Sequence, residues 1–287
     1  MTVAVLGIGL MGRAIAGRLM ACGHRVVVYN RTVEKCAPLA ALGAEVAPSP
    51  EAAIRAAQWV LLMLADAAAI HSVLSGRGVV AALRGRVVIQ MGTIASAESR
   101  ALGQEIEGAG AEYLEAPVLG SIAEAQDGRL LVMVGGRQEL FDRSKELMLC
   151  LGAAPELVGP VGHAAALKLA LNQLIASHIA AFSLSLGYLC RAGVSVDLFR
   201  KVLGQSALSA PMFEKKYPRL ETHSYKDPNF TVRHLLKDVR LFLNEAEGEG
   251  LDVRGLSGVP LLLEKTITLD RGEEDYSAVY EAINPGP

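Results

Sequence analysis

Short runs of apolar residues alternate with longer, mixed segments over the first half of this 287-residue chain. The short runs are rich in Val, Ile and Leu, which is typical of strands buried on both faces of a parallel sheet. The mixed segments carry helix signals, such as the N-cap Ser49 followed by Pro50 at the first helical position. This alternation predicts a mostly parallel sheet covered by helices on both faces.

The predicted elements of this half follow one another closely. The strands begin at Val3 and at Arg25, and continue with Trp59–Leu64, Arg86–Gln90, Glu112–Glu115, Leu130–Val134 and Pro155–Val158. The helices are one ending at Gly23, Val33–Leu42 before Gly43, one opening at Ser49-Pro50, Ala67–Leu74, Ser96–Gly108 and Gln138–Leu151. We expect this α/β domain to cover residues 1–161.

The pattern changes beyond residue 161. His163–Arg191 is apolar nearly all round and contains no proline, which predicts one long, buried helix. A membrane span is disfavoured because polar residues interrupt the apolar run at Lys168, Asn172, Gln173 and His178.

The last third of the chain predicts helices and no strand. These helices are Val196–Leu203 behind its cap Ser195, Phe230–Glu249 and Val259–Arg271. We therefore expect a long interdomain helix over residues 162–192 and an all-helical domain for substrate binding and oligomerisation over residues 193–287.

A glycine motif lies directly after the first strand. Gly7, Gly9 and Gly12 have the spacing G-x-G-x-x-G and open a helix. The first glycine allows a tight turn, the second lets a pyrophosphate approach the backbone, and the third lets the helix pack on the strand. Backbone N–H groups around Leu10 and Met11, at the positive end of that helix, would hold the phosphate charge. Because two strands flank the motif, a dinucleotide site is favoured over an ordinary turn.

The end of the second strand bears on the choice of dinucleotide. Enzymes that use NAD place Asp or Glu there to bind the ribose hydroxyls, whereas this chain has Asn30-Arg31-Thr32. Arg31 offers a charged planar fork for a 2′-phosphate, and Asn30 and Thr32 offer hydrogen bonds. A surface arginine is the alternative. We expect NADP(H) to be preferred over NAD(H).

Composition excludes several other classes of function. The chain is 51% hydrophobic and 20% charged with a net charge of −2, and only 5% of its residues are aromatic, so nucleic acid is not an expected partner. Its four cysteines are scattered without metal-ligand spacing, so no metal site is expected. The N-terminus lacks a basic signal-peptide region, and we expect a cytoplasmic protein with no membrane association.

Lys168 and Asn172 are the first candidates for chemistry. A lysine in a nearly apolar helix is seldom fully buried without a partner, although it can also extend toward solvent. Asn172 follows four residues later and so lies on the same helix face. A partly desolvated lysine suits general acid–base work, and the functional interpretation is slightly favoured over the structural one.

Other candidates have equally ordinary alternatives. Gly120 and Ser121 follow a strand of the α/β domain, where they could bind a small polar substrate or merely form a turn. Lys237 and Asp238 are adjacent on a helix, so they point to different faces and need not pair. A solvated charge pair is the default interpretation there.

Taken in order, these motifs resemble the β-hydroxyacid dehydrogenase family, which includes 3-hydroxyisobutyrate dehydrogenase and the glyoxylate/succinic semialdehyde reductases. The resemblance covers nearly the whole chain through residues 7–12, 115–121, Gly162 to Asn172, and Lys237-Asp238. It implies a Rossmann-type domain joined by a long helix to an all-α domain, with the active site in the cleft between them.

The resemblance also implies roles for individual residues. Lys168 matches the family's catalytic lysine, and Asn172 matches its neighbouring asparagine. Substrate-binding positions are matched by Thr93, Leu119, Gly120, Ser121, Phe230 and Asp238. Cofactor contacts are matched by Thr93 and Lys237, while Met63 and Leu64 are expected to line the cofactor cleft.

Two residues depart from the family pattern Asp-Ala-Pro-Val-Ser-Gly. Glu115 replaces the aspartate, a change that resembles the glyoxylate reductases. Leu119 replaces the serine that helps to hold the substrate carboxylate, and leucine cannot donate a hydrogen bond. The pocket should therefore be more apolar, which leaves the substrate open.

Together these features predict an NADP(H)-dependent oxidoreductase that interconverts a small aldehyde, semialdehyde or keto acid and its hydroxy acid. Lys168 would be the general acid and base. One alternative is an imine reductase of the same architecture, against which Lys168 argues. Another is a non-catalytic nucleotide-binding protein of this fold. The long apolar helix also predicts a homodimer or homotetramer.

Overall fold

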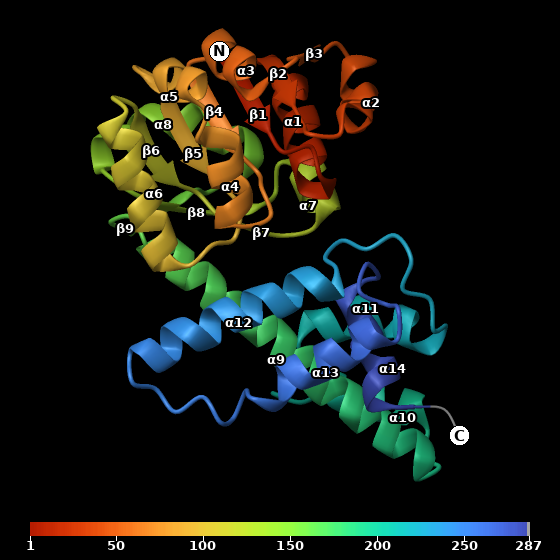
Figure 1. The fold of residues 1–287 in the computed structure, drawn as a ribbon. Coiled ribbons are helices and arrows are strands. Elements are labelled where there is room, and N and C mark those ends of the chain that lie inside the picture. Colours follow the sequence, from red (N-terminus) through yellow and green to blue (C-terminus); the bar gives the residue numbers. More distant parts are fainter. Residues whose placement is uncertain (286–287) are drawn as a thin grey trace. The chain divides into compact units, whose positions relative to one another are not determined.

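The computed structural model describes residues 1–285 and divides into two compact units, Met1–Leu169 and the residues from Ala170 onward. Figure 1 shows the sheet with its helices in the first unit and helices alone in the second. The division falls within helix α9 (His163–Arg191).

The first unit is built on one sheet of nine strands. In chain order the strands are β1 (Thr2–Leu6), β2 (Arg25–Tyr29), β3 (Glu45–Val46), β4 (Trp59–Leu62), β5 (Val87–Gln90), β6 (Glu112–Glu115), β7 (Val118–Leu119), β8 (Leu131–Gly135) and β9 (Glu156–Gly159). Their spatial order is β3-β2-β1-β4-β5-β6-β8-β7, and β9 pairs with β8. The pairs from β3 to β6 are parallel, while β8 runs antiparallel to β6 and β7. The predicted mostly parallel sheet is confirmed.

Helices cover both faces of this sheet. They are α1 (Leu10–Ala21), the 3-10 helix η1 (Val33–Cys36), α2 (Ala37–Ala40), α3 (Pro50–Ala56), α4 (Ala67–Leu74), α5 (Arg77–Leu83), α6 (Ser96–Gly108), α7 (Ile122–Asp127) and α8 (Gln138–Leu151). Alternate residues of β1 pack in two different hydrophobic clusters, one on each face of the sheet, as expected for a strand buried on both faces. Val5 packs in the cluster that holds Ile15 of α1 and Leu147 of α8, whereas Leu6 packs in the cluster that holds Ile54 of α3 and Ile70 of α4.

The second unit is helical, as predicted. Beyond α9 it contains α10 (Val196–Gly204), α11 (Pro211–Glu221), α12 (Val232–Gly248), α13 (Gly258–Thr268), η2 (Tyr276–Ala278) and α14 (Val279–Ile283). Its core joins Phe182 of α9 to Leu235 and Val239 of α12 and to Leu263 of α13. No strand follows β9 within residues 1–285, apart from an isolated bridge between Thr231 and Asp275.

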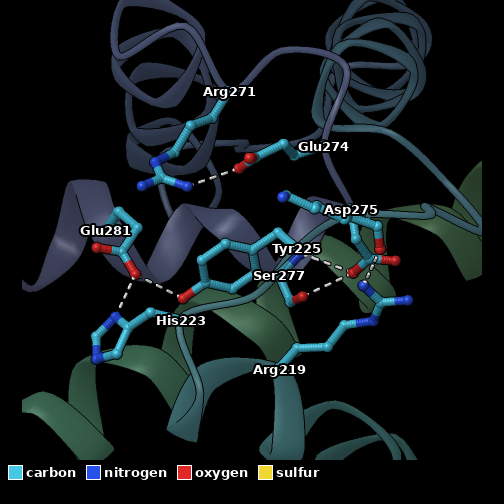
Figure 2. Close-up of polar contacts among 9 residues, drawn as sticks. Arg219, His223, Tyr225, Arg271, Glu274, Asp275, Ser277 and Glu281 are labelled. Atoms are coloured by element: carbon cyan, nitrogen blue, oxygen red, sulfur yellow. Dashed lines mark hydrogen bonds and ion pairs between the residues drawn. The ribbon is translucent and has the colours of Figure 1, made fainter.

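A polar network ties the last segment of this unit to the loop after α11 (Figure 2). Glu281 accepts hydrogen bonds of 2.6 Å from the Tyr225 hydroxyl and from His223, and Arg271 pairs with Glu274 at 2.7 Å. Asp275 is fully buried and accepts a hydrogen bond of 2.7 Å from the Ser277 hydroxyl. Each of these carboxylates, the buried Asp275 and the partly buried Glu274 and Glu281, is satisfied by neighbouring donors.

Helix α9 corrects one prediction. The sequence predicts burial on all sides, but Leu174, Leu184 and Tyr188 are exposed, Tyr188 to 70%. One chain covers only one side of this helix, although its residues are apolar on the other side as well. By length and composition α9 is the one helix among the described residues that could cross a bilayer, and 39% of its apolar 18-residue segment is buried within the protein.

Candidate functional site

The glycine turn after β1 has the geometry that its spacing predicts. Gly7 has a φ of +102°, and a Cβ there would lie 2.2 Å from the carbonyl oxygen of Met63. A Cβ on Gly12 would lie 2.0 Å from the carbonyl oxygen of Gly7, so the helix packs against the turn itself. Gly9, by contrast, faces open space, with nothing within 4 Å of its missing side chain. Of the three glycines, Gly9 alone leaves open space beside the backbone, at the position where a pyrophosphate would approach.

The start of α1 fits an anionic group. Gly9 is its N-cap and no side chain caps the helix, while its first turn contains no acidic residue. The first N–H groups of a helix lack partners within the helix and attract negative charge. The turn also lies where the strand order reverses, because β1 pairs with β2 on one side and with β4 on the other. Open α/β sheets bind ligands at such a switch point, so the residues present fit the pyrophosphate of a dinucleotide.

Met63 and Leu64, the two predicted cleft residues, follow β4 at this switch point. The Met63 carbonyl packs against Gly7, and a Cβ on Gly92 would lie 2.5 Å from the carbonyl oxygen of Leu64. Both side chains are partly buried. The structure thus brings Met63 and Leu64 to the predicted dinucleotide turn.

Asn30 holds this turn against the end of β2. Its Oδ1 accepts a hydrogen bond of 2.9 Å from the N–H of Ile8, and its Nδ2 donates one of 2.9 Å to the carbonyl of Thr32. Asn30 therefore fixes the position of the following loop. Arg31 and Thr32 are exposed in that loop, and within residues 1–285 no carboxylate pairs with Arg31. The guanidinium is available to a ligand.

Thr93 lies in a turn after β5 that the neighbouring Gln90 shapes. The Gln90 side chain accepts a hydrogen bond of 2.6 Å from the N–H of Gly92 and donates one of 3.0 Å to its carbonyl. Gln90 is fully buried, so this clamp fixes the backbone beside Thr93. The sequence interpretation missed Gln90, because nothing in the pattern separates it from the strand that it ends.

Leu119, Gly120 and Ser121 form the end of β7 and the turn into α7. Leu119 is partly buried and pairs with Leu131 across the strands. Gly120 has a φ of +144°, and a Cβ there would lie 2.7 Å from Leu130, so larger residues are strained at this position. Ser121 caps α7: its N–H donates 2.8 Å to Glu124, and its hydroxyl also contacts that carboxylate. The Ser121 hydroxyl therefore already has a hydrogen-bond partner within the turn.

Glu115, at the end of β6, is a residue whose task the sequence does not reveal. It is fully buried, and its Oε1 accepts hydrogen bonds of 2.8 Å from the N–H groups of Gly162 and Ala164. Those groups lie at the start of α9, and the Ser99 hydroxyl donates to Oε2. Glu115 thus anchors the helix that carries Lys168. The spacing of 47 residues between the partners gives no local signal.

Lys168 and Asn172 both lie on α9, one helical turn apart. Lys168 is partly buried in the first unit, whereas Asn172 lies in the second unit and is only 2% exposed. The i,i+4 spacing directs the two side chains along one face of the helix.

Asp238 of α12 fixes the Asn172 amide. The Nδ2 of Asn172 donates a hydrogen bond of 2.6 Å to Oδ2 of Asp238, which is 1% exposed. An ionised carboxylate only accepts, so the amide must present its NH2 group to Asp238. The other amide atom, Oδ1, is buried and has no hydrogen-bond partner among the described residues. A buried acceptor left open in this way is suited to a donor on a ligand.

Lys237 corrects the expectation that it need not pair with its neighbour. Its ammonium lies 2.9 Å from Oδ1 of Asp238, because a long lysine side chain can fold back along the helix. The pair is not a solvated one, since Asp238 is buried. Phe230, just before the Thr231 cap of α12, packs its ring edge-on against Tyr276 at 5.9 Å between centroids. In the second unit the structure therefore joins Asn172, Asp238 and Lys237 directly, whereas Phe230 packs on Tyr276.

A metal site among the described residues would need several ligating side chains close together. No group of three or more His, Cys, Asp or Glu side chains within residues 1–285 is arranged to hold a metal ion.

Two family models match the chain end to end. Residues 2–162 match the NAD-binding domain of 6-phosphogluconate dehydrogenase, and residues 162–283 match the NAD-binding domain of NADP-dependent 3-hydroxyisobutyrate dehydrogenase. The first match alone covers more than half of the chain. The chain therefore has an NAD(P)-binding domain of known type.

Named relatives extend over the same length. Glyoxylate/succinic semialdehyde reductase 1 of Arabidopsis thaliana is 34% identical over 99% of this chain and 98% of that protein. The human cytokine-like nuclear factor N-PAC is 28% identical over 98% of this chain but only 51% of its own length. The crystal structure of a 3-hydroxyisobutyrate dehydrogenase from Salmonella typhimurium superposes with a TM-score of 0.88 at 25% identity, covering 98% of this chain and 99% of that chain.

A more distant likeness bears on the fold alone. An imine reductase from Myxococcus stipitatus in complex with NADP+ superposes with a TM-score of 0.68 at 20% identity, over 99% of this chain and all of that chain. Both its TM-score and its sequence identity are lower than those of the hydroxyisobutyrate dehydrogenase. With its Rossmann-type unit, long α9 helix and helical second unit, the chain belongs to the β-hydroxyacid dehydrogenase family, a family of NAD(P)-dependent oxidoreductases.

Proposed function

We propose that this protein uses NADPH to reduce a small aldehyde, semialdehyde or keto acid to its hydroxy acid, and catalyses the reverse oxidation with NADP+. The observation that carries the proposal is the fixed Asn172 amide, whose buried Oδ1 has no partner among the described residues, one helical turn from Lys168. An acceptor and an ammonium on the same helix face suit a substrate that gains or loses a proton at oxygen.

The proton chemistry falls to Lys168. Bound NADPH supplies the hydride that the carbonyl carbon receives. The Lys168 ammonium donates its proton to the carbonyl oxygen as negative charge develops there, so that the product leaves as an alcohol. Before that transfer, the same ammonium stabilises the developing oxyanion. In the oxidative direction the neutral amine takes the hydroxyl proton.

Asn172 orients the reacting groups. Because Asp238 holds its Nδ2, the amide cannot turn, and Oδ1 is left to accept a hydrogen bond from the product hydroxyl. Asp238 acts through this amide, and Lys237 balances its charge. The resemblance to the family supports Thr93, Leu119, Gly120, Ser121 and Phe230 as further substrate-binding residues. Ser121 contributes its backbone, since its hydroxyl is held by Glu124.

The preference for NADP(H) rests on the loop after β2. Gly7, Gly9, Leu10, Met11 and Gly12 would hold the pyrophosphate, and Thr93 and Lys237 are the further proposed cofactor contacts. Arg31 is exposed, Asn30 locks its loop to the glycine turn, and within residues 1–285 no carboxylate pairs with the guanidinium, which leaves it free to contact a dinucleotide held at that turn. This arrangement supports recognition of a 2′-phosphate.

A substrate panel tests the proposed reaction. Oxidation of NADPH and NADH should be followed with glyoxylate, succinic semialdehyde, tartronate semialdehyde, methylmalonate semialdehyde and cyclic imines. The proposal predicts that an aldehyde or semialdehyde is the best substrate and NADPH the better reductant. Turnover of cyclic imines alone would favour an imine reductase, and no NADPH oxidation with any carbonyl compound would favour a non-catalytic binding protein.

We also propose a cytoplasmic homodimer or homotetramer. The exposed apolar side chains Leu174, Leu184 and Tyr188 on α9, with Leu198 and Val202 on α10, support burial against a second copy. Light scattering should give at least twice the mass of the chain. A concentration-independent monomer would contradict the proposal.

A further inference from the structure

The start of α9 is held by a buried carboxylate from another part of the first unit. Oε1 of Glu115 accepts hydrogen bonds from the N–H groups of Gly162 and Ala164, both at 2.8 Å, and of Ala165 at 3.3 Å. Helix starts are usually capped by a residue next to the helix in sequence. Here the cap comes from the end of β6, so it fixes the helix to the sheet.

The second oxygen of Glu115 is also fully engaged. The Ser99 hydroxyl donates to Oε2 and lies 2.9 Å from the Tyr113 hydroxyl. Since an ionised carboxylate only accepts, the Tyr113 hydroxyl must donate to Ser99, which in turn donates to Glu115. Burial, the largest effect, and the nearby Glu115 charge both raise the pKa of Tyr113, so it keeps its proton. All these groups are buried.

The neighbouring backbone leaves room for this carboxylate. A Cβ on Gly135 of β8 would lie 2.3 Å from Oε1 of Glu115. Two other ionisable groups lie nearby: Arg100 borders Gly162 and His163 borders Gly159. Neither forms an ion pair with Glu115 within residues 1–285. The Glu115 charge is therefore balanced by helix N–H groups and hydroxyls rather than by a cation.

We propose that Glu115 is a positioning residue for Lys168, because it fixes the start of α9 and places at that end of the helix a negative charge that favours the protonated Lys168. Lys168 lies four residues beyond Ala164, about 6 Å along the helix axis. A carboxylate bound at the positive end of a helix offsets the partial charge there. Lys168 lies on the second turn of α9, within reach of the carboxylate's own charge. The inference rests on the proposed role of Lys168 as general acid.

The test compares the pH dependence of kcat for Glu115→Gln, Glu115→Asp and the wild type. In the reductive direction Lys168 must be protonated, so kcat falls as pH rises through its pKa. Loss of one charge on the order of 10 Å away should move this alkaline limb to lower pH by about half a unit to one unit. Glu115→Asp keeps the charge, so the alkaline limb of its pH–kcat profile should lie at the wild-type pH.

A matched control separates this effect from capping in general. Asp66 caps α4 by accepting a hydrogen bond of 2.7 Å from the N–H of Ala69, and α4 does not carry Lys168. Asp66→Asn should leave the limb in place. If Glu115→Gln does not fold, Gly135→Ala is the second variant, because its methyl group displaces the Glu115 carboxylate from α9 and should shift the limb in the same direction.

A second readout does not depend on turnover. The pH at which Lys168 becomes half-reactive toward acetic anhydride, measured by mass spectrometry on the protein without cofactor, should fall by the same amount in Glu115→Gln. The inference would be overturned if a folded Glu115→Gln protein kept both the wild-type alkaline limb of kcat and the wild-type pH of half-reactivity toward acetic anhydride. An equal shift of the alkaline limb in Asp66→Asn would also overturn it. Failure of the proposed function would look different, since Lys168→Ala would then remain active.

Discussion

The side-chain amide of Asn172 donates a hydrogen bond of 2.6 Å to Asp238, and both residues are almost completely buried. The two lie 66 residues apart, on α9 and α12. This contact gives Asn172 one orientation and leaves its oxygen as a buried, open acceptor.

If Asp238 acts through Asn172, the two residues form one functional unit. Asn172→Ala and Asp238→Ala should each lower kcat by roughly 10- to 100-fold, and the double variant should be no worse than the more damaged single one. Steady-state kinetics with a shared substrate gives the coupling. Asn244→Ala, an exposed change on the same α12 helix, should have no effect. Additive losses in the double variant would show that the two residues act independently.

The cofactor preference depends on Arg31. Arg31→Ala should raise the KM for NADPH about tenfold, since a lost charged contact costs about 1.4 kcal/mol, and should leave the KM for NADH unchanged. Arg25→Ala at the other end of β2 is the control, because that arginine is exposed and pairs with Glu45 instead. An unchanged KM for NADPH in Arg31→Ala would refute the assignment.

Leu119 is expected to limit binding of the substrate carboxylate. Leu119→Ser restores a hydroxyl donor and should lower the KM for succinic semialdehyde by at least about tenfold, since one hydrogen bond to a charged group is worth about 1.5 to 3 kcal/mol. Leu131→Ser alters the residue that faces Leu119 across the strand pair, and it should leave KM unchanged because its side chain is 61% exposed. A KM that rises in Leu119→Ser would mean that the pocket prefers an apolar substrate.

Glu281 should contribute to stability at low pH. Burial alone would raise its pKa, but hydrogen bonds from Tyr225 and His223 outweigh burial and hold the pKa below its ordinary value of 4.5 (Figure 2). A carboxyl whose pKa is lower in the folded state stabilises the fold above its unfolded pKa, and this contribution is lost as pH falls through the folded value.

Glu281→Gln should therefore lower Tm at neutral pH and reduce the further loss of Tm between about pH 5 and pH 3. Differential scanning calorimetry over this range measures both effects. The control is Glu264→Gln, which removes an exposed ion pair with Arg240 and should keep the wild-type pH dependence. Parallel curves for Glu281→Gln and the wild type would contradict the assignment.

Local signals explain why much of the fold could be predicted from the sequence. The bounds of α4, α6, α8 and α9 match the predictions residue for residue. Helices α4, α6 and α8 show an apolar period, and α9 is a long apolar run that contains no proline. Ser49 caps α3 as predicted, with its hydroxyl 3.1 Å from the N–H of Ala52. The predicted helix Val33–Leu42 is instead a 3-10 turn followed by a single α-turn, because Pro38 interrupts it.

Elements that lack a sustained apolar period and a capping signal could not be predicted from the sequence. Helix α11 contains Pro218, α5 contains Gly78, and strand β7 has only two residues, so none shows a sustained period. The missed parts of the site are contacts between distant segments: Glu115 reaches α9, and Asp238 reaches Asn172. Spacing along the chain cannot predict such pairs, since they depend on how complete elements pack.

The central claim is that Lys168 supplies the proton. The most direct measurement is single-turnover oxidation of bound NADPH by the wild type and by Lys168→Ala, with succinic semialdehyde or glyoxylate as substrate and with NADPH affinity measured alongside by fluorescence. Lys168→Ala should bind NADPH within about twofold of the wild type and lose roughly 100- to 10,000-fold in rate, the range for a general acid. A folded Lys168→Ala protein that oxidises NADPH at the wild-type rate would contradict the account.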